Sequence, residues 1–247
     1  MPFTGAHPAV FLPFLRSGMV SATGLIAGSI APDFEYFLRM HTGNTISHAW
    51  SGVFLFDMPV GIGIALLFHQ VIRQPLLENL PVFLQQRLHN VWTTDFLCSL
   101  KEHPFRFVFC LLTGILSHIG WDTLTHNSHL VQEFNLYQET YLRIGKTNYP
   151  LFYVLQQVST IIGLALVILY IVMMPKDCSD FSYPRDRRFW PILILTAIGL
   201  FMIRFLLTGW EFDLGNVVVS AVSSLMAGVV VSGLVVRRSP AGIRRTS

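Results

Sequence analysis

Five stretches of this chain are long, apolar and almost free of charged side chains. An α-helix rises about 1.5 Å per residue, so about twenty apolar residues cross the hydrocarbon core of a bilayer. Backbone groups in lipid must find their hydrogen bonds within the segment, which favours helices. The five stretches are residues 51–72, 105–124, 151–174, 189–208 and 215–236. They predict an all-α polytopic membrane helix bundle with about five full spans.

The composition excludes an ordinary soluble domain, because 52% of the residues are hydrophobic and only 13% are charged. We therefore interpret residues 1–247 as a single integral membrane domain in contact with membrane lipid. The formal net charge is only +3, and the basic residues are spread over the loops. This distribution argues against nucleic acid as a partner.

The apolar segment near the N-terminus is interrupted. Pro13 and Gly18 fall near the middle of residues 7–33. The segment is long enough for one span, but the interruption favours a hairpin of two short helices that enter and return on the same side. Only the hairpin would bring His7 back beside Asp33, because a full span would place them on opposite sides.

Two mixed segments complete the predicted organisation. Residues 1–50 comprise the N-terminal apolar hairpin and a polar loop. Residues 73–104 carry apolar side chains at helical spacing, which predicts an amphipathic helix along the cytoplasmic membrane surface.

Small residues at every fourth position predict places where helices pack closely. Gly24 and Gly28 form such a step near the N-terminus. The last span carries a longer series, made up of Ser220, Ser224, Gly228 and Ser232. We interpret both series as helix packing seams.

The basic residues predict the orientation of the spans. If the C-terminus is cytoplasmic, alternation of the five spans places twelve of the 17 Lys and Arg residues on the cytoplasmic side. The same orientation places Asp33, Glu35, His48 and residues 118–126 on the outer side. Polar residues that are distant in sequence are thus predicted to share one membrane face.

The end of the second predicted span carries a metal-ligand pattern. His118, Asp122 and His126 are spaced four residues apart, so a helix places them on one stripe. Two imidazoles and a carboxylate suit zinc or another divalent first-row ion, and the Asp could alternatively orient a ligating His. The other interpretation is that these residues cap a helix at the depth of the lipid headgroups.

Three motifs resemble an uncharacterised bacterial membrane family that is catalogued only as a domain of unknown function. They are Met1-Pro2-Phe3-Thr4-x-x-His7-Pro8, Gly28-x-x-x-Pro32-Asp33-Phe34-Glu35-Tyr36, and the block from Leu116-Ser117-His118 to His126. This likeness covers most of the chain.

The first half also resembles, more distantly, inner-membrane metal-dependent hydrolases. That family shows an early His, then Pro-Asp-x-Asp, then Thr-His-Ser, then Ser-His-x-x-x-Asp-x-x-Thr. The matching positions here are His7, Pro32-Asp33, His48, and His118 with Asp122 and Thr125. The chain departs from the pattern in two places, since Glu35 replaces the second Asp and His48 lies between Ser47 and Ala49.

The second resemblance implies a metal-dependent hydrolase in a bacterial inner membrane. One or two divalent ions, zinc foremost, would be bound by His7, Asp33, His48, His118 and Asp122. If the site is a hydrolase, Glu35 or His126 is our candidate for the general base, and His126 lies just beyond the block that matches the family. The predicted outer-face position suggests a lipid or lipid-linked phosphoester as substrate.

The alternative is a membrane protein without catalytic activity, an assembly factor or transporter, whose polar cluster binds an ion or a partner structurally. Transport is the less favoured form of this alternative, because the candidate ligands gather at one interface and the sequence shows no clear internal repeat.

Overall fold

The computed structural model describes residues 4–43, 45–125, 141–144, 147–176, 183, 185–209 and 213–236. The chain divides into two compact units, which we describe separately. Unit 1 comprises Met1–Asp33, Ile46–Ile62 and Leu100–Tyr170. Unit 2 comprises Phe34–Thr45, Gly63–Ser99 and Ile171–Ser247.

The protein is an all-α polytopic helix bundle, as the sequence predicts. Within the described residues, five helices are long and apolar enough to cross a membrane. They are Trp50–Asn79, Pro104–Thr125 (α9), Leu151–Met173 (α11), Phe189–Thr208 (α12) and Leu214–Val236 (α13). Four agree with the predicted spans to within a residue, and the first extends seven residues beyond its predicted end at residue 72.

The first spanning helix continues through Pro59 because its winding changes just before the proline. It consists of α3 (Trp50–Gly52), η3 (Val53–Asp57), α4 (Met58–Leu67), η4 (Phe68–Ile72) and α5 (Arg73–Asn79). The segments η3 and η4 are π-helical, and the Met58 N–H donates to the Val53 carbonyl. A proline ring clashes with the carbonyl four residues earlier in an α-helix, and the wider π-turn relieves this contact.

The N-terminal segment forms two short helices in unit 1. They are the 3₁₀ helix η1 (Thr4–Phe11) and the α-helix α1 (Ala22–Ile30), which is followed by the single 3₁₀ turn η2 (Ala31–Asp33). Ser21 caps α1, because its hydroxyl accepts a hydrogen bond from the Gly24 N–H. The interrupted sequence therefore yields separate helices, while their depth in the membrane stays a prediction.

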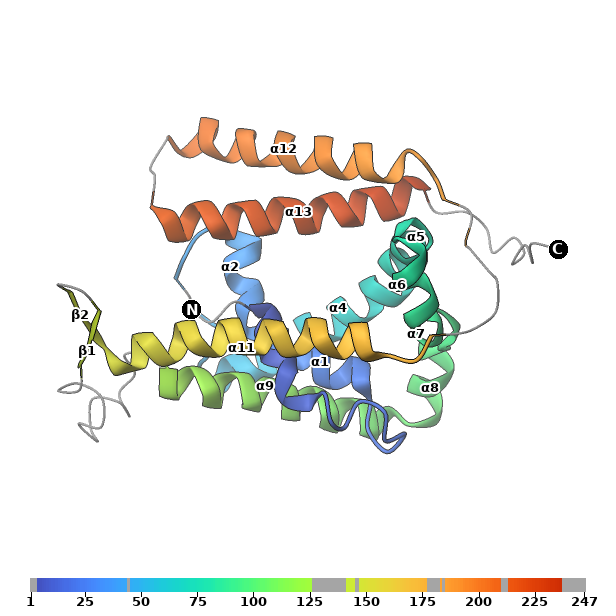
Figure 1. The fold of residues 1–247 in the computed structure, drawn as a ribbon, viewed down its shortest axis with the longest axis horizontal. Helices are drawn as coiled ribbons and strands as arrows, with labels where there is room; N and C mark the ends of the chain where they lie inside the picture. Colours follow the sequence, from blue (N-terminus) through green and yellow to red (C-terminus); the bar gives the residue numbers. More distant parts are fainter. Residues whose placement is uncertain are drawn as a thin grey trace. The chain divides into compact units, whose positions relative to one another are not determined.

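Helix α1 packs along α9 through glycines, as the G-x-x-x-G step predicts (Figure 1). A Cβ added to Gly28 would lie 2.1 Å from the Leu111 carbonyl oxygen, and one added to Gly114 would lie 2.5 Å from the Leu25 oxygen. Any larger residue at these positions would force the two backbones apart. This contact brings the end of α1 against the last turns of α9.

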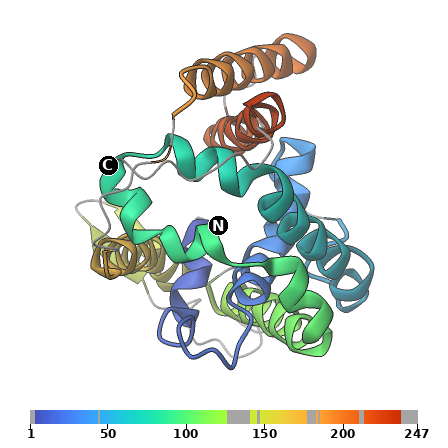
Figure 2. The same ribbon diagram turned by 90° about the vertical axis from the view of Figure 1, so that its right-hand side faces the viewer.

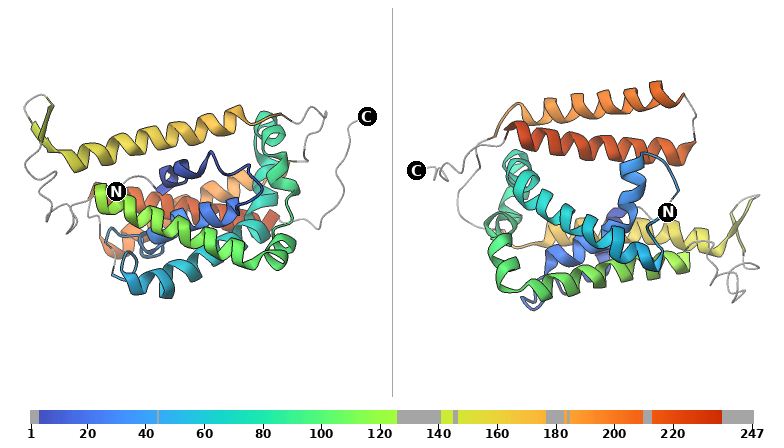
Figure 3. Two further views of the ribbon diagram at one scale, coloured as in Figure 1. Left: turned by 90° about the horizontal axis from the view of Figure 1, so that it is seen from below. Right: turned by 180° about the vertical axis from the view of Figure 1, so that it is seen from behind.

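Helix α11 belongs to unit 1 as far as Tyr170. It follows a small antiparallel hairpin, β1 (Tyr141–Ile144) and β2 (Thr147–Pro150), which lies at its N-terminal end (Figure 3). The segment η1 lies between α9 and α11 in both Figures 2 and 3. Gly163 of α11 touches η1, because a Cβ there would lie 2.8 Å from the Ala6 Cβ.

Unit 2 contains the pair α12 and α13, which run side by side (Figure 1). The predicted seam of small residues on α13 lies in this packing, since a Cβ on Gly228 would lie 2.6 Å from the Leu193 carbonyl oxygen. Ser232 donates to the Phe189 carbonyl at 3.1 Å. Ser220 of the same series donates to the Met40 carbonyl, just after α2 (Phe34–Arg39).

The predicted amphipathic helix over residues 73–104 is divided into short pieces (Figure 2). They are the end of the first span (α5), then α6 (Val82–Arg87), α7 (His89–Thr93) and α8 (Phe96–Glu102). Pro81 causes the first break, because a residue before proline avoids the helical region and Leu80 is extended at ψ 160°. Gln85 stabilises the break by donating to the carbonyls of Glu78 and Leu80.

Candidate metal centre

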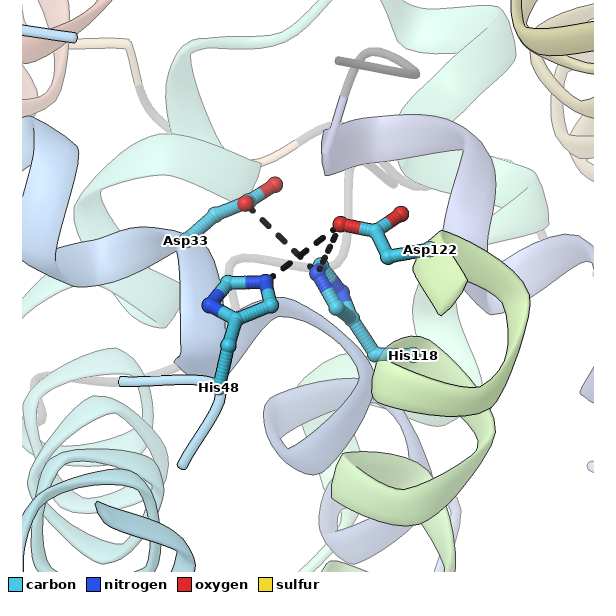
Figure 4. A group of neighbouring side chains, drawn as sticks. All are labelled: Asp33, His48, His118 and Asp122. Atoms are coloured by element: carbon cyan, nitrogen blue, oxygen red, sulfur yellow. Dashed lines mark hydrogen bonds and ion pairs between the residues drawn. The ribbon is translucent and has the colours of Figure 1, made fainter. Parts of the chain in front are cut away.

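Four potential metal ligands from three segments of unit 1 meet at one point (Figure 4). Asp33 ends η2, His48 lies in the turn before α3, and His118 and Asp122 lie one turn apart on α9. Each offers one ligand atom, and these atoms all lie within 4.8 Å of one another. Asp33, His118 and Asp122 are buried, whereas the His48 side chain is 17% exposed.

Three of the distances between these atoms are close to the distance between two ligands of one ion. His118 Nε2 lies 3.5 Å from Asp33 Oδ1 and 3.4 Å from Asp122 Oδ2. His48 Nε2 lies 3.3 Å from the same Asp122 oxygen. Two ligands about 2.1 Å from a tetrahedral zinc ion are separated by about 3.4 Å. The four residues could therefore hold a divalent ion.

His118 is oriented by a backbone carbonyl. Its Nδ1 lies 2.7 Å from the carbonyl oxygen of Ser29, and a carbonyl can only accept, so Nδ1 carries the hydrogen. The other nitrogen, Nε2, faces the two carboxylates. Among the described residues, neither His118 Nε2 nor Asp33 Oδ1 has a hydrogen-bond partner, although both atoms are buried. A bound cation would satisfy both, and an orienting carbonyl behind a ligating imidazole is the usual arrangement.

Asp33 is held from its other side by Thr4. The Thr4 hydroxyl donates a short hydrogen bond to Asp33 Oδ2, which leaves Oδ1 directed at His118. The sequence analysis did not assign a role to Thr4 or to Ser29. Thr4 does belong to the opening motif Met1-Pro2-Phe3-Thr4, which was the available signal. Ser29 had none, because it contributes only its backbone.

His48 has an unusual backbone conformation, with φ at +69°. A left-handed φ is uncommon for a residue with a side chain, and such strain concentrates at functional sites. The turn is packed against α3, because a Cβ on Gly52 would lie 2.0 Å from the Ile46 carbonyl oxygen. Ser47 Oγ lies 3.1 Å from His48 Nδ1, and the ring presents Nε2 to Asp122.

His7 lies beside the group of four rather than within it. Its ring stacks on that of His118 with centroids 3.8 Å apart. His7 Nε2 lies 3.7 Å from Asp122 Oδ1, the oxygen that does not face His118. The structure thus brings together all five predicted ligands, four of them around a common point and His7 against the His118 ring and the second Asp122 oxygen.

Of the two predicted general bases, the structure describes only Glu35. Glu35 belongs to unit 2, where its Oε1 accepts hydrogen bonds from Arg39 and from the backbone and hydroxyl of Thr45. These contacts stabilise the turn that follows α2. His126 lies outside the described residues. The catalytic roles of both residues stay predictions.

Comparison with known sequences gives one family. The family described as "Domain of unknown function (DUF4184)" matches residues 1–234, a range that includes all the predicted ligands. No curated protein and no solved structure matches the chain. The resemblance to a family of unknown function is therefore confirmed, whereas its bacterial origin and the likeness to metal-dependent hydrolases stay predictions.

Proposed function

We propose that this chain, which belongs to the DUF4184 family, is a membrane-embedded metal-dependent hydrolase that acts on a lipid or lipid-linked phosphoester. The observation that carries the proposal is the buried group of two histidines and two aspartates with ligand-like spacing. Imidazole and carboxylate ligands together favour zinc, with other divalent first-row ions as competitors.

Different residues of the chain position the ligands, exclude bulk water and remove the proton from the attacking water. When bound, a divalent ion lowers the pKa of a coordinated water toward neutrality and stabilises negative charge on a phosphoryl oxygen. Ser29 and Thr4 fix the ligand atoms of His118 and Asp33 before any ion or substrate arrives. Burial of Asp33 and His118 excludes bulk water, so charges in the site interact strongly. We assign removal of the water proton to Glu35 or His126 on the sequence evidence alone.

The location of the ligands supports a lipid substrate. Asp122 is three residues from the end of α9 at Thr125, which is about 5 Å along the helix axis. The site therefore lies near one end of a spanning helix, at the level where a lipid headgroup could reach it. We assign this end to the outer face of a bacterial inner membrane, with the C-terminus in the cytoplasm, from the charge distribution.

One observation favours the alternative, a protein without catalytic activity that binds an ion structurally. Four protein ligands complete a tetrahedral zinc site, and structural zinc sites are closed in this way, whereas catalytic sites keep an open position. His48 decides between the two functions, because it is the most exposed of the four and the least supported by helices. A catalytic site requires that it yield its place to substrate or water.

The test begins with elemental analysis of detergent-purified protein after dialysis without chelator. We expect near-stoichiometric zinc, manganese or iron in the wild type and its loss in His118→Gln and Asp122→Asn. His103→Gln is the matched control, because His103 is exposed and lies outside the cluster. Full metal retention in both site variants would overturn the metal site.

The metal-loaded protein is then assayed for phosphate release from phosphatidate and from undecaprenyl diphosphate in micelles. We expect release by the wild type and by His103→Gln, and none by His118→Gln. Stoichiometric metal without hydrolysis of either substrate would contradict the hydrolase and favour the structural ion site.

A further inference from the structure

We propose that an apolar pocket beside the candidate metal centre binds a hydrocarbon chain, so that the ligand of the site is a phosphate amphiphile with its headgroup at the cluster. This inference rests on the proposed function and specifies its substrate class. The pocket has a volume of about 680 Å³ and is formed by η1, α9 and α11, all within unit 1. Pockets of 300–1,000 Å³ with mainly apolar walls are typical of small-ligand sites.

Helix α9 turns one face to the metal centre and the neighbouring face to the pocket. His118 and Asp122, four residues apart, form the first face. Ser117, Trp121 and Leu124 line the pocket and form the second. Consecutive residues on a helix are separated by about 100°, so the two faces adjoin along the same turns. A molecule that reaches both faces needs only to pass around one side of α9.

His7 forms the wall that the two compartments share. Its ring stacks on the His118 ring at 3.8 Å and also lines the pocket. The segment η1, which carries His7, lies between α9 and α11 (Figure 3). A hydrocarbon chain bound in the pocket would therefore have one end within reach of the ligand cluster.

The opposite wall is the apolar face of α11. Leu155, Val158, Ile162 and Leu166 line the pocket at helical spacing. Only 11% of the α11 span is buried within the described structure, so this helix is the least covered of the five. Water in this apolar pocket would lack hydrogen-bond partners, whereas a hydrocarbon chain needs none.

Two contacts fasten α11 to the rest of unit 1 beside the pocket. Trp121 Nε1 donates to Ser159 Oγ at 3.4 Å, and Gly163 touches Ala6. Trp121, Ser159, Gly163 and Ala6 all line the pocket, so these contacts hold its two walls together.

Gly120 provides the test, because it lines the pocket and a Cβ there would meet nothing within 4 Å. A leucine at this position can occupy the pocket without displacing the backbone. The matched control is Gly63→Leu on α4, where a Cβ also meets nothing within 4 Å and which does not line the pocket.

The probe is dodecyl phosphate with a diazirine near the end of its chain, photolysed with the purified metal-loaded protein in phosphatidylcholine vesicles. We expect labelled peptides from residues 117–124 and 155–166, and loss of label when unlabelled dodecyl phosphate competes. Butyl phosphate should compete at least about a hundredfold less well, because it buries fewer methylenes. Labelling should fall about tenfold in Gly120→Leu and stay unchanged in Gly63→Leu. Unchanged metal content and melting temperature in both variants show that the fold is intact.

Equal labelling of Gly120→Leu and wild type would overturn the inference, as would competition by dodecanol equal to that by dodecyl phosphate. The second result would mean that the pocket takes up bilayer chains without regard to the headgroup. Because labelling reports binding, pocket labelling without any hydrolysis would contradict the hydrolase and leave the pocket assignment standing. Hydrolysis of p-nitrophenyl phosphate without pocket labelling would contradict the pocket assignment and leave the hydrolase standing.

Discussion

His118 Nδ1 donates a hydrogen bond to the carbonyl oxygen of Ser29, with 2.7 Å between the nitrogen and the oxygen. This bond joins α9, which carries two ligands, to the end of α1, just before Asp33. The geometry of the candidate metal centre thus depends on how closely two helices approach, and that approach depends on glycine.

Replacement of Gly28 by Ala should damage both stability and metal binding. The new methyl group would lie 2.1 Å from the Leu111 carbonyl oxygen, which is backbone and cannot move aside. We expect a loss of about 1–3 kcal/mol in the free energy of unfolding, as for other overpacked sites, and weaker metal binding because Ser29 moves from His118. Thermal unfolding in detergent and metal titration measure the two effects. Gly120→Ala on α9 is the control, and a Gly28→Ala protein as stable as this control would refute the packing argument.

Removal of metal should lower the stability of the wild type but not that of His118→Gln. An ion bound only by the folded protein adds about 2.7 kcal/mol when its free concentration is 100 times Kd. We expect a chelator to lower the melting temperature of the wild type and of His103→Gln by several degrees. The His118→Gln protein should melt at the same temperature with and without chelator. A chelator effect of the same size in all three proteins would locate the stabilising ion elsewhere.

Replacement of Thr4 by Val should weaken metal binding without removing a ligand. Thr4 donates to Asp33 Oδ2, and valine has the same shape without the hydroxyl. Loss of such a supporting hydrogen bond typically reduces metal affinity about 10–100-fold. Competitive titration against a fluorescent chelator measures the change. Thr4→Ser should restore most of the affinity, and equal binding by Thr4→Val and wild type would show that Asp33 is held by other contacts.

Two replacements of His48 should separate its strained backbone from its ligand role. Asn tolerates a left-handed φ and Val does not, so both variants lose the imidazole but only His48→Val strains the turn. In chelator, we expect His48→Val to be about 1–3 kcal/mol less stable than His48→Asn. Met40→Asn is the control, because Met40 also has a left-handed φ, of 52°, but is not a predicted ligand. The Met40→Asn protein should be more stable than the wild type and should keep its metal. Equal stability of His48→Val and His48→Asn would argue against backbone strain at His48.

The spanning helices could be predicted from the sequence because length and apolarity are sufficient for that purpose. The pair His118 and Asp122 could also be predicted, since helical spacing fixes their common face. Their meeting with Asp33 and His48 required the family pattern, because no local rule joins residues so far apart in sequence. The carbonyl of Ser29 could not be predicted, since every residue has one. The division of residues 73–104 was predictable in part, because Pro81 marks its first break.

All the groups that form the metal centre lie between Thr4 and Asp122, in the first half of the chain. Synthesis proceeds from the N-terminus, so every ligand has left the ribosome before α11, α12 and α13 have been made. The apolar pocket differs, because it needs α11 as its second wall. During biosynthesis the ligands of the candidate metal centre can therefore come together first, and the proposed lipid pocket is complete only after the next helix has been inserted.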